Sequence, residues 1–286
     1  MVTITNGINK VEIDGNSVNK TYLRGRDGFK RELEAIMLVP HFSKDCQMPN
    51  VVYTMDSDQP MICMDYIPHQ QNLADHVAKD PSSVFNNLEK TLRFIDTVSI
   101  QTNHRYAVPS ALKNKLDTYP SRYESVIDSG HLARIGAMRD QLGVMPISSA
   151  HGDLRLNNVL EGNDGQIYVI DWEHFSDNAQ PYDAATMLVN ICVLLYSADK
   201  PEHITKISPL FDRYSSRFGK DFYISMVGRT LVEFSPAVAR EEYLKKERMI
   251  PFLNGVLDAS LQGYEQGLSI DKVLGMIAKH AGRMYE

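Results

Sequence analysis

Two acidic residues and one amide lie close together in the sequence, in a spacing suited to phosphoryl transfer. Residues 151–158 read His-Gly-Asp-Leu-Arg-Leu-Asn-Asn, and Ile-Asp-Trp-Glu follows at 170–173. A turn between these segments would let Asp153, Asn158 and Asp171 face a common point. Mg²⁺ prefers oxygen ligands and takes only one or two from protein, whereas a carboxylate can accept a hydroxyl proton. The pattern therefore predicts Mg-ATP chemistry, with Asp153 as general base and Asn158 and Asp171 on the metal.

The residues before position 68 are predicted to form antiparallel strands and a single helix. Asn-Gly at 6–7 and Asp-Gly at 14–15 favour tight hairpin turns, because these residues tolerate positive φ angles. Apolar residues recur at helical spacing over 29–39, and Pro40 ends that pattern. The expected strands cover 2–5, 8–13, 17–23, 51–55 and 61–66.

The sequence after about residue 73 is predicted to be mainly helical. Asp80-Pro81 favours a helix start, since aspartate accepts hydrogen bonds at an N-cap and proline suits the first helical turn. Further amphipathic helices are expected after Asp183. The single expected β interruption is a hairpin over 158–170, which turns at a Gly-Asn-Asp-Gly sequence.

Composition and charge narrow the class of protein. The 286 residues are 43% hydrophobic and 23% charged, as in an ordinary globular chain, and the net charge of −6 disfavours a nucleic-acid partner. No apolar run approaches the roughly 18 residues of a membrane span, and residues 1–15 lack the features of a signal peptide. Cys46, Cys63 and Cys192 are too widely spaced for a disulfide framework or a zinc ribbon. A cytoplasmic location is therefore expected.

The motifs at 151–158 and 170–173 resemble those of the aminoglycoside phosphotransferase / choline kinase-like superfamily, whose members are relatives of the protein kinases. The resemblance is most specific over residues 151–183. It implies a bilobal α+β fold of the protein-kinase type, with a small antiparallel β N-lobe at 1–67 and a large, mainly helical C-lobe at 68–286. It also implies ATP and Mg²⁺ as cofactors and the hydroxyl of a small molecule as phosphate acceptor, such as an aminoglycoside, a sugar, a choline-like compound or an amino alcohol.

The resemblance assigns roles to five residues of this region. Asp153 matches the family's catalytic aspartate, and Asn158 and Asp171 match its metal ligands. Asp183 fits a further aspartate that opens the next helix and braces the catalytic loop. His151 looks like the histidine that anchors this loop.

The resemblance also implies a lysine on the third strand that holds the nucleotide phosphates and pairs with a helix glutamate. Lys20 is the predicted lysine, with Lys10, Arg24 and Arg26 as alternatives. Glu32 is the predicted partner, with Glu34 as its alternative.

The adenine is expected to lie against the connector between the lobes, near the backbone of Asp65 and Ile67. A loop that covers the phosphates is only weakly indicated, since Asn-Gly at 6–7 is far from a full Gly-rich motif.

Arg155 departs from the family pattern. It lies two residues after Asp153, where Ser/Thr protein kinases have a lysine on the γ-phosphate, so it is predicted to act in catalysis. The alternative is an ion pair with Glu173 or Asp177. Trp172, the only tryptophan, is expected in the core beside the metal site rather than in an aromatic cage for a quaternary amine.

For several polar residues, a simple surface position is preferred to a functional role. His174 is expected at the surface, because no second histidine stands at metal-ligand spacing. Glu233, Glu241 and Glu242 are expected on solvated helix faces, although such acids could also line a pocket for a cationic acceptor.

Two further functions compete with a small-molecule kinase. A protein or peptide kinase is favoured only by Arg155, and the sequence has no Ala-Pro-Glu element and no recognisable activation segment between Asp171 and Asp183. A non-catalytic nucleotide-binding regulatory module would not need Asp153, Asn158 and Asp171 together. The sequence leaves the acceptor and the oligomeric state open.

Overall fold

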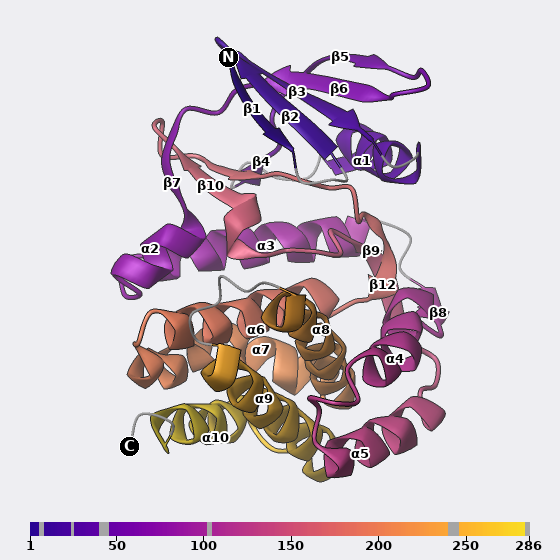
Figure 1. Cartoon of the computed structure of the whole chain (residues 1–286), viewed down its shortest axis with the longest axis vertical. Helices are drawn as coiled ribbons and strands as arrows, with labels where there is room; N and C mark the ends of the chain where they lie inside the picture. The colour runs from indigo at the N-terminus through magenta and orange to yellow at the C-terminus, as the bar shows by residue number, and fades with distance from the viewer. Residues whose placement is uncertain (6–8, 24–25, 40–45, 102–104, 240–245, 284–286) are drawn as a thin grey trace.

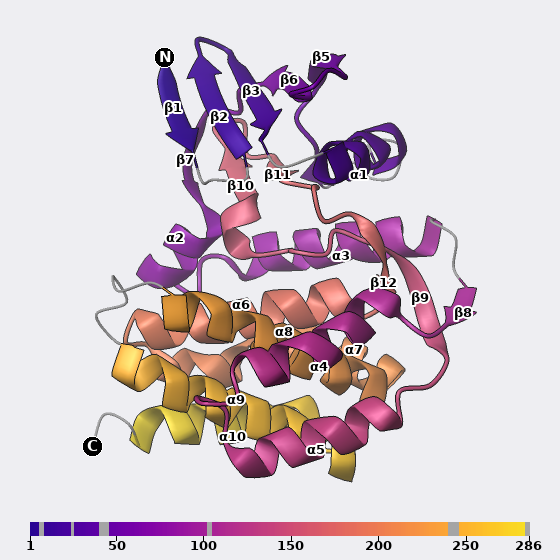
Figure 2. The ribbon, with the colours of Figure 1, turned by 45° about the vertical axis from the view of Figure 1, so that its right-hand side comes forward.

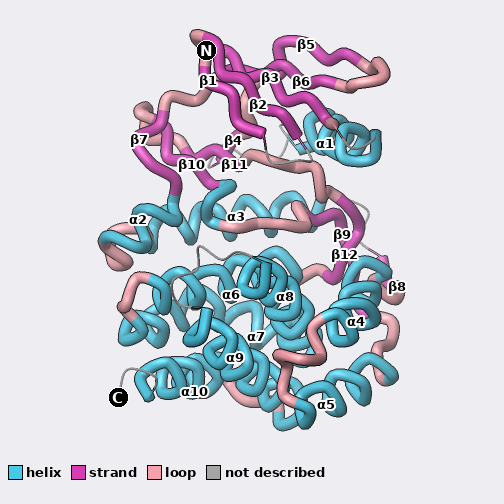
Figure 3. Tube along the Cα trace, in the orientation of Figure 1, coloured by secondary structure: helices cyan, strands magenta, loops and turns pink. Residues whose placement is uncertain are grey.

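The computed structural model describes residues 1–5, 9–23, 26–39, 46–101, 105–239 and 246–283. A β-rich N-terminal part lies above a larger, mainly helical part (Figure 1). Figure 3 shows how strongly helices dominate the second part. The predicted α+β architecture is confirmed.

A five-stranded antiparallel sheet forms most of the N-terminal part. Gly15, with φ +59°, occupies the two-residue turn of the second hairpin, where positive φ suits glycine. The strands were all predicted to within a few residues of their ends. In spatial order they are β1 (Val2–Thr5), β2 (Asn9–Asp14), β3 (Ser17–Tyr22), β6 (Met61–Asp65) and β5 (Val51–Met55).

One helix, α1 (Arg26–Leu38), packs against this sheet and begins three residues before the predicted start. Its Phe29 meets Tyr22 of β3 edge-on, with ring centroids 5.7 Å apart, and Ile62 of β6 completes a small buried core. This core holds α1 at a fixed distance from β3. The chemistry of the site depends on that distance, because each of the two elements carries one of its charged residues.

Two smaller sheets connect the parts of the chain, and they contradict the expectation of a single β interruption after residue 73. The missed strands are only two to six residues long, and they pair with segments far away in the sequence, so local patterns do not reveal them. One sheet has the order β4 (Cys46–Gln47), β11 (Ile167–Val169), β10 (Val159–Gly162) and β7 (His69–Asn72), and the other has β12 (Ser176–Ala179), β9 (Met145–Ala150) and β8 (Arg105–Ala107).

The helical part is built around one large apolar core. In both views α3 lies between the N-terminal sheet above and helices α6 to α10 below (Figures 1 and 2). Helix α6 is buried along nearly its whole length and contacts α2, α3, α7, α8 and α9. The helices are α2 (Leu73–Lys79), α3 (Phe85–Gln101), α4 (Ser110–Arg122), α5 (Ser129–Asp140), α6 (Tyr182–Ser197), α7 (Ser208–Phe218), α8 (Lys220–Ala239), α9 (Lys246–Gln266) and α10 (Ile270–Arg283).

One predicted helix start was wrong. Asp80 does not open a helix but follows the end of α2, and α3 begins only at Phe85. The Asp80 carboxylate instead accepts hydrogen bonds from the backbone N–H of Ser82, at 3.1 Å, and from its hydroxyl, at 2.6 Å. These bonds stabilise a local turn that competes with the helix.

Among the described helices, none has the length and apolarity that crossing a membrane requires.

The small core of the N-terminal part predicts a measurable stability difference within α1. Phe29→Ala should lower the free energy of unfolding by about 3–5 kcal/mol, because it removes a buried aromatic ring and leaves a cavity. Met37→Ala, on the exposed face of the same helix, should change it by less than about 0.5 kcal/mol. Urea unfolding followed by circular dichroism compares the two variants, and equal losses would contradict this account of the core.

Candidate active site

The segment between β9 and β10 carries the His-Gly-Asp motif, and its path requires glycine. Gly152 has φ +83°, and a Cβ atom there would lie 2.4 Å from the backbone oxygen of His174. Only glycine allows the chain to pass so close to the segment that follows Trp172. The two motifs of the sequence are therefore in direct contact at this point.

His151 links the same two segments from inside the protein. Its buried ring lies 4.6 Å from the ring of Trp172, which is also fully buried, as expected. Nε2 lies 2.9 Å from the backbone oxygen of Ile170, and Nδ1 lies 3.3 Å from the backbone nitrogen of Asp153. Because a carbonyl oxygen only accepts, Nε2 carries the proton and Nδ1 accepts from Asp153. The ring thus joins the His-Gly-Asp motif to the strand end before Asp171.

Asp183, in the first turn of α6, holds the backbone of the motif. One carboxylate oxygen accepts from the His151 N–H at 2.7 Å, and the other accepts from the Gly152 N–H at 3.0 Å. Burial raises the pKa of this carboxyl, while His151 and the two N–H donors oppose that rise. Farther along α6, the side-chain oxygen of Asn190 accepts from the Leu156 N–H at 2.9 Å. One buried helix therefore anchors both ends of the loop.

Asp153 lies in this loop between two arginines. Arg155 Nε lies 2.8 Å from Asp153 Oδ1, and Arg229 Nη1, from α8, lies 2.7 Å from the same oxygen. Burial alone would raise the pKa of Asp153, but the guanidinium groups of Arg229 and Arg155 hold it well below its usual range. The carboxylate therefore stays ionised.

Two expectations about charged neighbours were wrong. Arg155 pairs with Asp153 rather than with Glu173 or Asp177, and its backbone N–H also donates to the Asp153 carbonyl, which keeps the two residues close. Glu233 is not on a solvated face: it is 6% exposed and receives a hydrogen bond from Arg229, one helical turn earlier on α8. Glu241 and Glu242 lie outside the described residues.

Arg229 is a site residue that the sequence analysis missed. An Arg and a Glu four residues apart on a helix usually form an exposed pair. The apolar surroundings of this pair in α8 were the available signal.

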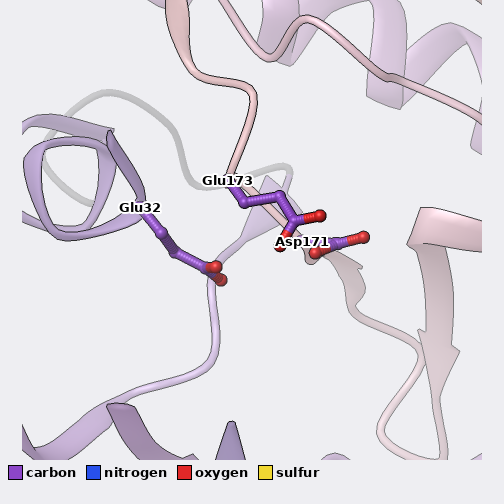
Figure 4. A group of neighbouring side chains, drawn as sticks. All are labelled: Glu32, Asp171 and Glu173. Atoms are coloured by element: carbon purple, nitrogen blue, oxygen red, sulfur yellow. The ribbon is translucent and has the colours of Figure 1, made fainter. Parts of the chain in front are cut away.

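Lys20, on β3, is surrounded by carboxylates. Its Nζ lies 2.7 Å from Glu32 Oε2 and 3.2 Å from Glu173 Oε2, and it donates a short hydrogen bond to Asp171 Oδ1. Burial alone would lower the pKa of Lys20, but the three carboxylates raise it well above its usual range. Figure 4 shows the three acids converging, with Glu32 on α1 and the other two on the segment after β11.

The alternatives to Lys20 and Glu32 lie elsewhere. The Lys10 side chain is 40% exposed and pairs with Glu12, and Arg26 lies near Asp56 at the surface. Glu34 is exposed on α1. Arg24 and the Asn-Gly pair at 6–7 are outside the described residues.

The two predicted metal ligands are held close together by the backbone. The Ile170 N–H donates to the Asn158 carbonyl at 3.0 Å, which brings Asp171 beside Asn158. The Asn158 amide donates to the Asp153 backbone oxygen at 3.0 Å, and this leaves its amide oxygen as the atom able to bind a cation. Asp171 has φ +67°, a left-handed conformation that is uncommon outside glycine and clusters at functional sites.

Glu173 is a second residue that was missed as part of the site. Its carboxylate contacts Lys20 and accepts a hydrogen bond from Asn9 of β2. Together with Glu32 and Asp171 it forms a group of three acids close enough to share a metal ion. The ammonium of Lys20 already lies among them and offsets one of their three negative charges in this conformation. The His174 side chain is 54% exposed, as expected for a surface residue.

A cavity of about 270 Å³ opens beside these groups. Its walls are mostly apolar and come from the N-terminal sheet on one side and from β10 and the residues after β11 on the other. Asp65 and Ile67, the predicted adenine neighbours, both line it. The other lining residues are Asn9, Val11, Ile13, Val18, Lys20, Glu32, Pro49, Met64, Tyr66, Asn158, Leu160, Ile170 and Asp171.

An adenine nucleotide and Mg²⁺ fit this set of groups. Apolar walls suit a purine, and a buried lysine at one end suits phosphate. A carboxylate and an amide oxygen beside that lysine suit magnesium.

Comparison with known proteins identifies the fold. No family model and no curated protein sequence matches the chain. Among solved structures, a thermostable mutant of aminoglycoside phosphotransferase APH(4)-Ia, in complex with ADP and hygromycin B, has a TM-score of 0.61 and 13% identity over 92% of this chain and 94% of its own.

Two other solved structures give the same result. A choline/ethanolamine kinase family protein from Mesorhizobium loti has a TM-score of 0.53 and 13% identity over 97% of this chain and 92% of its own. A glucosamine kinase in complex with glucosamine, ADP and inorganic phosphate has a TM-score of 0.56 and 14% identity over 91% of this chain and 79% of its own. The chain therefore has the aminoglycoside phosphotransferase / choline kinase-like fold, as the resemblance of its motifs predicted.

The close passage at Gly152 can be tested by comparison with a second glycine. Gly152→Ala should lower the free energy of unfolding more than Gly165→Ala. Both residues have positive φ, a conformation that costs alanine about 1–2 kcal/mol. However, a Cβ at Gly165 meets no atom within 4 Å. Thermal or urea unfolding measures the difference, and equal losses would mean that the contact with His174 relaxes freely.

Proposed function

We propose that the protein is an ATP-dependent phosphotransferase that moves the γ-phosphate to a hydroxyl group of a small molecule. The observation that carries this proposal is that Lys20, Asn158 and Asp171 line the apolar cavity, while the Asn158 amide donates to the backbone oxygen of Asp153. This arrangement matches a nucleotide that lies with its base in the cavity and its phosphates toward Asp153. The neighbours of known activity, which act on an aminoglycoside, on choline or ethanolamine, or on glucosamine, support the same class of reaction.

The proposed roles follow from the chemistry of each group. Lys20 would bind the α- and β-phosphates, with Glu32 holding its ammonium in place. Asn158 and Asp171 would hold Mg²⁺, which neutralises charge on the phosphate oxygens when it is bound. Because Lys20 now occupies Asp171 Oδ1, Asp171 would have to exchange the lysine for the metal when the nucleotide enters.

On the acceptor side, Asp153 would orient the attacking hydroxyl and take its proton. Arg155 lies beside Asp153 and would add positive charge near the transferred phosphoryl group. Asp183 and His151 would hold the loop in place without touching the reactants.

A small acceptor is favoured over a peptide by the segment between Asp171 and Asp183. Most of it is used in the turn after Asp171 and in β12, which pairs with β9. That leaves no length for an activation segment on which a peptide could dock. The presence of all three polar groups, Asp153, Asn158 and Asp171, disfavours a purely regulatory nucleotide-binding module.

The reaction can be tested by release of ADP from Mg-ATP. The wild-type protein should release ADP with at least one acceptor from a panel of aminoglycosides, amino sugars, choline, ethanolamine and peptides. Asp153→Asn should lower kcat about 10²–10⁴-fold, because the amide cannot accept the hydroxyl proton, while Mg-ATP binding by thermal shift stays near wild type. Full turnover by Asp153→Asn would remove this residue from the proposed chemistry.

The proposed metal site has its own test. Asp171→Ala should abolish the Mg²⁺-dependent part of the thermal shift produced by ATP, since it removes the only charged ligand of the proposed pair. His174→Ala, three residues away and exposed, serves as the control and should respond to Mg²⁺ like the wild type. An unchanged Mg²⁺ response in Asp171→Ala would contradict the assignment.

A further inference from the structure

A chain of buried charges connects helix α8 to the carboxylate of Asp153. Arg229 is 1% exposed, and its Nη1 lies 2.7 Å from Asp153 Oδ1. Its Nη2 donates a short hydrogen bond to Glu233, which is itself 6% exposed. Removing a guanidinium from water costs several kcal/mol, so Arg229 depends on both carboxylates for compensation.

Both arginines bind the same oxygen of Asp153. Arg155 approaches Oδ1 from the catalytic loop itself, and Arg229 approaches it from α8. Within the described part of the chain, no donor reaches Oδ2. Two donors on one oxygen oppose rotation of the carboxylate, because turning the group away from this orientation breaks both bonds. Oδ2 is thereby left for another hydrogen-bond donor.

Arg229 contacts both carboxylates but leaves one of its own donors without a partner. Its Nε atom is buried and has no hydrogen-bond partner among the described residues. A buried donor without a partner costs about 1–3 kcal/mol. A residue present only to stabilise α8 would not need this arrangement, since apolar side chains of similar volume commonly replace a buried ion pair without loss of stability.

We propose that Arg229 is a positioning residue for phosphoryl transfer: it holds Asp153 so that Oδ2 faces the acceptor hydroxyl, and Glu233 holds Arg229. The inference rests on the proposed function, because it needs Asp153 to meet an acceptor. It adds a requirement that lies outside both sequence motifs, at a residue that follows the second motif by more than fifty positions.

The test removes the buried charges together, so that no lone charge remains in the core. In the double variant Arg229→Met, Glu233→Met, kcat for the first panel hydroxyl that supports ADP release should fall about 100-fold, the usual effect of a misplaced catalytic group. If no panel hydroxyl is used, hydrolysis of Mg-ATP by water serves as the assay. KM for Mg-ATP should remain within threefold of wild type, roughly the limit of a minor binding effect.

Three comparisons separate positioning from a structural role. In the Asp153→Asn background, the same double substitution should cause no further loss of kcat, because the group to be positioned is already inactive. Arg134→Met is the matched control: Arg134 also binds two carboxylates, Asp258 at 2.6 Å and Glu265 at 2.8 Å, but on α5 and α9, and its loss should leave kcat unchanged. Arg229→Lys should retain more activity than the double variant, since lysine still supplies a buried cation at this position.

Each outcome decides the proposal. Retained kcat in the double variant, or an equal further loss in the Asp153→Asn background, would overturn the role of Arg229 while leaving the proposed function intact. Absence of any ADP release by the wild-type protein, with every hydroxyl and with water, would overturn the proposed function and this inference with it. A fall in kcat that is confined to the background with intact Asp153 is the expected result.

Discussion

The site depends on one buried carboxylate, that of Asp183, and on the two backbone N–H groups that it binds. Its two oxygens accept from the successive N–H groups of His151 and Gly152, so one side chain fixes the backbone at the start of the loop. Because Asp183 belongs to a helix buried on all sides, the loop takes its position from the core. The location of Asp153 therefore follows from the packing of α6.

Two charged clusters of different balance adjoin this scaffold. In one, three acids surround the single ammonium of Lys20, so the cluster has an excess of negative charge that suits a further cation. In the other, Arg155 and Arg229 are matched by Asp153 and Glu233, so the charges are balanced within it. Because a buried charge is costly without a partner, this balance stabilises the second cluster.

Much of the fold and part of the site could be predicted from sequence because the signals were local. The hairpin turn at Asp-Gly (14–15) and the apolar periodicity in α1 depend on neighbouring residues, and the N-terminal strands were placed correctly. Short strands such as β4 and β7 were not found, since their stability comes from partners more than eighty residues away. The helix start predicted at Asp80 was wrong for a related reason: a local turn to Ser82 competed with the helix that the sequence favoured.

The sequence by itself determined which groups could do chemistry, because Asp153, Asn158 and Asp171 stand at spacings that a loop and a hairpin can bring together. Only the tertiary structure decided what surrounds them. The local sequence does not say which partners Arg229 and Glu173 meet, and they join the site because α8 and the segment after β11 pack beside the loop. Long-range packing places such charges, and it fixes which oxygen of Asp153 remains open to an acceptor.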